Sequence, residues 1–155
     1  MTHNHHTAGE APHNHTIQYG LLVSFLIIWI LDSFILRFTA YVYIMPFFFN
    51  IFLGIPIIIA GVYLASRAHI VFETPEPQVV DTGLYSRVRH PMYLGSILLY
   101  VGFWVTTLSL LTLIPLFAVI IGYNYLASAE ERMLTEKFGD EYLEYKKRVS
   151  KWIPL

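Results

Sequence analysis

The chain consists of long apolar runs separated by polar segments, and the runs indicate its architecture. The first run covers residues 17–36 and the second covers 41–65. After a polar connection come two shorter runs, 91–107 and 110–127, separated by hydroxyl side chains. A helix of about 20 apolar residues crosses a bilayer. The pattern therefore predicts an all-α, polytopic integral membrane protein with about four transmembrane helices, the last two forming a helical hairpin.

Some residues within the first two runs depart from the apolar pattern. Asp32 lies near the end of the first run, where we expect it to reach the membrane interface beside Arg37. The second run contains Gly54 and Gly61, which permit close contact with another helix.

The two ends of the chain are polar. Residues 1–16 are predicted to be a disordered tail holding five of the seven histidines, and such tracts can bind divalent metals weakly. The remainder, 17–155, is predicted to form one membrane domain. Its last part, 128–149, is predicted to form amphipathic helices, with Gly139 as the cap that ends the first of them. The apolar face of the final helix, which includes Tyr142, is expected to lie on the membrane surface or to fold back over the polar loop.

Composition and charge support a membrane location. Apolar residues make up 55% of the 155 residues and charged residues only 14%. The absence of cysteine excludes disulfides and thiolate sites, and the net charge of −1 gives no indication of a nucleic-acid partner. Of the ten Lys and Arg residues, nine lie in the polar loop or after the last span. The positive-inside rule then places this loop, both termini and any site there on the cytoplasmic side.

The segment 81–95, DTGLYSRVRHPMYLG, brings polar residues directly against an apolar run. Pro91 suits the first position of a helix, and His90 before it is expected to be extended. The free N–H groups at such a helix start, with Arg87 and Arg89 nearby, can hold a carboxylate or phosphate. The alternative is that the two arginines are only interfacial anchors.

A second candidate position lies after the last apolar run. Helical spacing puts Glu130 on the same face as Tyr123, so Glu130 can look into the hairpin that begins at Pro91. A carboxylate there can hold a cationic group, and a pocket completed by the helix start suits a zwitterionic, partly apolar ligand. The alternative is that 130–132 is a solvated helix end. His90 and Glu130 alone offer too few ligands for a metal site.

Together these motifs resemble the isoprenylcysteine carboxyl methyltransferase family, which is related to the membrane phospholipid N-methyltransferases. RHPMYLG (89–95) follows VVDTGLY (79–85), and EERML and FGDEYLEYKKRV come after the hairpin. The resemblance extends from Arg67 to the C-terminus. It implies methyl transfer from S-adenosylmethionine, with His90 and Glu130 as catalytic residues. The cofactor-binding residues that it implies are Gln78, Val80, Tyr85, His90, Pro91, Met92, Tyr93 and Glu130.

The chain departs from the family pattern at one position that bears on the substrate. The family carries an arginine four residues before the first glutamate, where this chain has Leu126. The remaining candidates for contacts with the substrate are Arg89, Arg132, Tyr123 and Asn124. The acceptor therefore stays open between a prenylcysteine-like carboxylate, a lipid amine and a small thiol. Two alternatives to a methyltransferase are an NADPH-dependent membrane reductase of the sterol-reductase kind and a non-enzymatic membrane protein with a metal-binding histidine tail.

Overall fold

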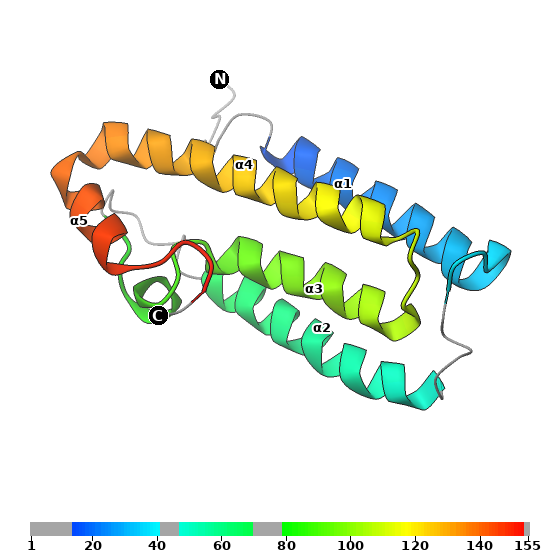
Figure 1. The fold of residues 1–155 in the computed structure, drawn as a ribbon. Coiled ribbons are helices and arrows are strands. Elements are labelled where there is room, and N and C mark those ends of the chain that lie inside the picture. The colour runs from blue at the N-terminus through cyan, green and yellow to red at the C-terminus, as the bar shows by residue number, and fades with distance from the viewer. Residues whose placement is uncertain (1–13, 41–46, 70–78, 154–155) are drawn as a thin grey trace, which may run out of the picture.

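The computed structural model describes residues 14–40, 47–69 and 79–153, and these residues form a helical bundle (Figure 1). Successive long helices run in opposite directions, with α1 beside α4 and α2 beside α3 (Figure 1). The elements are α1 (Asn14–Ile30), its π-helical continuation η1 (Leu31–Leu36), α2 (Phe47–His69), the 3-10 turn η4 (Gly83–Ser86), α3 (Pro91–Thr107), α4 (Leu113–Phe138) and α5 (Asp140–Arg148).

The helices have the lengths and surfaces of a membrane protein. Within the described part of the chain, three stretches are long and apolar enough to cross a bilayer: Thr16–Leu36, Phe48–Ala68 and Leu113–Phe138. Large apolar side chains such as Phe52 and Ile121 are mostly exposed, as side chains that face lipid would be. The all-α integral membrane fold is thus confirmed. Because α3 is apolar but has only 17 residues, the count of four crossings stays a prediction.

Glycines bring α2 and α3 into close contact. Gly61 faces Gly95, and Gly54 faces Gly102 one heptad away on each helix. A Cβ atom on Gly95 would lie 2.6 Å from the backbone nitrogen of Ala65 and 2.7 Å from the carbonyl oxygen of Gly61. Only glycine permits this approach, so the expectation that Gly54 and Gly61 serve helix contact is confirmed. The contact with α2 near Gly95 therefore helps to fix the position of the start of α3.

A buried polar cluster around Asp32 holds the end of η1, and the depth of Asp32 in the membrane stays a prediction. Its carboxylate is fully buried and accepts hydrogen bonds from the hydroxyls of Thr39 and Ser109 and from the backbone N–H of Thr39. The Asp32 side chain is turned into the bundle, and the Nε of Arg37 donates to the carbonyl of Phe34. The carboxylate of Asp32 ties η1 to the turn between α3 and α4.

Several predicted boundaries shift. The helix starts at Asn14, so residues 14–16 belong to α1 and not to the tail. The second helix extends to His69, past the expected end at 65, and the expected first residues 41–46 lie outside the described residues. The largest difference is in α4, which runs without a break from Leu113 to Phe138. The apolar run and the charged stretch after 127 are one helix, because no Gly or Pro occurs between Gly122 and Gly139 to end it.

The C-terminal part folds back over the segment before α3. Gly139 adopts φ +56°, which favours glycine, and its N–H caps α4 by donating to Thr135. Tyr142, Tyr145 and Val149 then form a buried cluster with Val79, Leu134 and Phe138. The Tyr145 hydroxyl donates to the carbonyl of Tyr85 at 2.7 Å. The structure therefore supports the second of the two expected placements for this face.

Candidate active site

The site is built around the start of α3. Pro91 is the first helical residue, and His90 before it has φ −126° and ψ +61°, outside the helical region as expected. The carbonyl of His90 accepts the N–H of Leu94 at 2.9 Å, which begins the helix. The backbone N–H of Arg89 donates to Ser150 at 2.9 Å. The C-terminal segment therefore fixes the backbone on which His90 stands.

Glu131 is the centre of a buried ionic cluster. Only 6% of its surface is exposed. Its Oε1 lies 3.1 Å from both His90 Nε2 and Arg89 Nε, and its Oε2 lies 3.1 Å from Lys146 Nζ. Arg89 also donates to the carbonyl of Lys146 at 3.0 Å. The alternative of a solvated helix end is wrong for Glu131, because this carboxylate joins α3, α4 and α5.

Glu130 points toward α3, as the helical spacing predicts. The Tyr93 hydroxyl donates a hydrogen bond to Glu130 Oε1, and His90 Nδ1 lies 3.7 Å from Glu130 Oε2. The rings of His90 and Tyr93 are stacked with centroids 5.8 Å apart. The imidazole of His90 therefore lies between two carboxylates, one on each ring nitrogen.

Burial favours the neutral form of His90. Desolvation lowers the pKa of His90, in the same direction as the charges of Lys151 and Arg89 and against its hydrogen bond with Glu131. A neutral imidazole that donates from Nε2 to Glu131 leaves a lone pair on Nδ1. This nitrogen can accept a proton on the side of Glu130.

Trp152 is a site residue that the sequence patterns did not indicate. Its ring centroid lies 5.9 Å from that of His90, and its indole N–H donates to Asn124 Oδ1 at 3.3 Å. The neighbouring Lys151 donates to Asn124 Oδ1 at 2.9 Å and to Ser128 at 2.8 Å. The C-terminal segment thus covers His90 from outside the bundle. No short motif connects residue 152 to residue 90, so only the fold brings them together.

The other predicted residues are near the site to different degrees. Tyr85 is buried in the segment before α3, and its hydroxyl donates to the carbonyl of Ala68 at 3.5 Å. Met92 is half-buried and packs on the core, and Val80 is half-buried in the approach to η4. Arg132 is exposed on α4. Gln78 lies outside the described residues.

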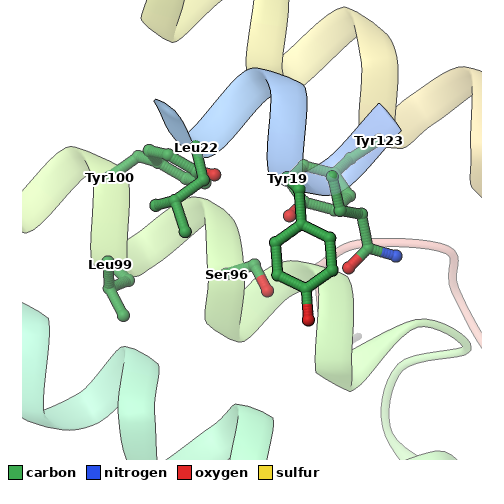
Figure 2. Close-up of a pocket in the computed structure, with 7 residues that line it drawn as sticks. Tyr19, Leu22, Ser96, Leu99, Tyr100 and Tyr123 are labelled. Carbon is green, nitrogen blue, oxygen red and sulfur yellow. The ribbon is translucent and has the colours of Figure 1, made fainter. Parts of the chain in front are cut away.

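A pocket of about 240 Å³ lies next to this cluster, between α1, α3 and α4 (Figure 2). Tyr123, predicted to contact the substrate, forms one wall, and its ring centroid lies 5.1 Å from that of Tyr93. The lining residues are Gln18, Tyr19, Leu22, Ser96, Leu99, Tyr100 and Tyr123. Within the described ranges no group of three or more acidic or histidine side chains is arranged to hold a metal ion.

Comparison with known proteins identifies the family to which this arrangement corresponds. The sequence profile of the family described as phospholipid methyltransferase matches residues 40–141, about two thirds of the chain. The chain belongs to this family. The matched region contains His90, Tyr93 and both glutamates, whereas Lys146 and Trp152, which contact Glu131 and His90, follow it in the sequence.

Individual relatives are methyltransferases by name. The chain is 38% identical over 95 residues to "Methanethiol S-methyltransferase 1" of Bradyrhizobium diazoefficiens. The aligned region covers 61% of this chain and 32% of the relative. It is 38% identical over 98 residues to "Protein-S-isoprenylcysteine O-methyltransferase" of Saccharomyces cerevisiae, covering 58% of this chain and 39% of the relative. The chain thus spans well under half of the length of these curated relatives.

Proposed function

We propose that this protein is an integral membrane methyltransferase that uses S-adenosylmethionine and acts on a lipophilic or membrane-partitioned acceptor. The observation that carries the proposal is the meeting of His90, Tyr93 and Glu130 at the start of α3. This cluster lies at one end of an apolar bundle, where a polar cofactor and an apolar acceptor can meet. Membership of the phospholipid methyltransferase family supports the same chemistry.

The residues at the site fit the chemical groups of S-adenosylmethionine. The cofactor carries a sulfonium, an ammonium and a carboxylate. Glu130 offers a carboxylate to the cationic groups, since its exposed fraction is only 15% and little water competes for it. The first N–H groups of α3 suit the anionic end. His90, Pro91, Met92, Tyr93 and Glu130 would hold the cofactor, which supplies an electrophilic methyl group when it is bound.

The protein's own groups would position the acceptor and handle its proton. A thiol or amine acceptor must lose a proton to become nucleophilic, and His90 Nδ1 or Glu130 can take it. A carboxylate acceptor needs no base. Trp152 and the C-terminal segment limit the access of water to His90, and methyl transfer depends mainly on positioning and on excluding water.

The charge distribution supports a cytoplasmic site. Arg87 and Arg89 precede α3, and Lys146, Lys147 and Arg148 end α5 at the same end of the bundle. The positive-inside rule assigns such an end to the cytoplasm. Both termini would then lie on that side as well.

The acceptor class is narrowed by the relatives and by one residue. The named relatives act on methanethiol and on isoprenylcysteine, so a thiol and a carboxylate are the two acceptor types that they suggest. Leu126, where the resemblance implies an arginine, is 1% exposed within the apolar core. The buried leucine offers no charge to a carboxylate and favours the thiol.

Calorimetric titration of detergent-purified protein with S-adenosylhomocysteine tests the cofactor assignment. We expect saturable micromolar binding that Glu130→Gln and His90→Ala abolish while the proteins stay folded. Glu136→Gln, at an exposed position of the same helix, is the matched control and should bind normally. Normal binding by both site variants would show that the site is wrongly placed, and no binding by the folded wild-type protein would refute the use of this cofactor.

A further inference from the structure

The pocket between α1, α3 and α4 has no role in holding the cofactor as proposed above. We propose that it receives the methyl acceptor, and that this acceptor is a small uncharged molecule with an apolar body and one hydrogen-bonding head, such as a thiol. The inference rests on the proposed function and adds the location and the charge class of the second substrate.

The lining of the pocket determines what it can bind. Leu22 and Leu99 provide apolar surface, and Gln18, Ser96 and the tyrosines provide neutral hydrogen-bonding groups (Figure 2). No charged side chain is among the described residues that line it. A carboxylate taken from water into such surroundings would lose its hydration without gaining a counter-charge, which is costly. An uncharged acceptor avoids this cost and partitions readily into the bilayer around the helices.

The position of the pocket connects it to the candidate active site through two contacts. Tyr123 lines the pocket, and its ring lies 5.1 Å from Tyr93, whose hydroxyl donates to Glu130. Ser96 also lines the pocket, and its hydroxyl donates to the carbonyl of Met92 at 3.1 Å. The inner wall of the pocket therefore adjoins the residues assigned to the cofactor, and an acceptor seated there has its head toward them.

The size of the pocket favours a small acceptor. Its volume of about 240 Å³ is below the roughly 300–1,000 Å³ of sites for drug-sized ligands. A short apolar chain with a small head fits this space. A lipid head group would also require a partner for its phosphate, which the described lining lacks.

A matched pair of ligands tests the charge class. Protein in nanodiscs, with and without saturating S-adenosylhomocysteine, is titrated calorimetrically with 1-octanethiol and with octanoate. We expect saturable binding of the thiol, and binding of the carboxylate that is weaker by about tenfold or more. Equal or tighter binding of octanoate would overturn the inference. If S-adenosylhomocysteine itself does not bind, the proposed function fails, while the comparison of the two ligands still tests the pocket.

Two variants test the location. Leu22→Trp fills the pocket from α1 and should weaken thiol binding by about tenfold or more while leaving the affinity for S-adenosylhomocysteine unchanged. The matched control is Val23→Trp, because Val23 is 53% exposed on the outer side of the same helix and should have no effect. Ser96→Leu fills the pocket from α3 and provides a second test if Leu22→Trp does not fold. Unchanged thiol binding in a folded pocket variant would place the acceptor elsewhere.

Discussion

Glu130 and Glu131 are consecutive on α4, but their side chains have different partners. Glu131 is bound by Arg89, His90 and Lys146, whereas Glu130 accepts the hydroxyl of Tyr93. One carboxylate is committed to joining three helical segments, and the other faces α3 beside the pocket wall. This division assigns a structural role to Glu131, and Glu130 is the carboxylate that we propose for binding the cofactor.

Exchanging each glutamate for alanine should separate the two roles. Glu131→Ala leaves the buried charge of Arg89 and the more exposed charge of Lys146 without their carboxylate, so we expect the free energy of unfolding to fall by about 3 kcal/mol. Glu130→Ala should cost much less stability and abolish binding of S-adenosylhomocysteine. Thermal unfolding in detergent and calorimetric binding measure the two effects. A larger loss of stability in Glu130→Ala than in Glu131→Ala would contradict the assignment.

Sequence patterns predicted much of this site because its signals are local. The register of His90 and Pro91 follows from the conformational limits of proline, and the direction of Glu130 follows from helical spacing with Tyr123. The cap at Gly139 is equally local, because it depends on the backbone freedom of one residue. Each of these features could be read from a few neighbouring residues.

The features that could not be predicted depend on contacts between distant segments. Trp152 meets His90 only because α5 folds back, and neither residue has a motif that indicates the other. The hydrogen bond between Ser109 and Asp32 could not be predicted, because the two residues are 77 positions apart in the sequence. The burial of Glu131 could not be distinguished from that of Glu130 for the same reason. Pairings of this kind become visible only in the folded structure.

The glycine contact between α2 and α3 gives a second prediction. Gly95→Ala places a Cβ atom 2.6 Å from the backbone of Ala65, so the helices must separate, and we expect a loss of about 2 kcal/mol in stability. Gly20→Ala is the matched control, because a Cβ atom there meets nothing within 4 Å and alanine favours the helix. Thermal unfolding of both variants in the same detergent checks the prediction. Equal stability of the two variants would show that the helices are not in close contact.

The buried Asp32 gives a third prediction: its substitution should lower the stability of the protein and leave ligand binding unchanged. Asp32→Ala removes the acceptor of the Thr39 and Ser109 hydroxyls, and we expect a loss of about 2 kcal/mol. The cluster lies at the other end of α3 from His90, about 25 Å away along 17 helical residues. The affinity for S-adenosylhomocysteine should therefore stay the same, as calorimetry can show.

The matched control for this variant is Ser24→Ala on the same helix. Ser24 is exposed, and its hydroxyl donates only to the carbonyl of Leu21, one turn before it. Its removal should change the stability by less than about 0.5 kcal/mol. A stability loss in Ser24→Ala as large as in Asp32→Ala would mean that α1 is generally sensitive and that the cluster has no special role.

The contact between Trp152 and His90 predicts how tightly the site is closed. Trp152→Ala removes the aromatic cover of His90 and the hydrogen bond to Asn124, so the dissociation rate of S-adenosylhomocysteine should rise about three- to tenfold. Stopped-flow displacement of a fluorescent analogue measures this rate. Ile153→Ala is the matched control, since this neighbouring side chain is 73% exposed, and it should leave the rate unchanged. If both variants release the ligand at the wild-type rate, the C-terminal segment anchors α5 but does not cover the site.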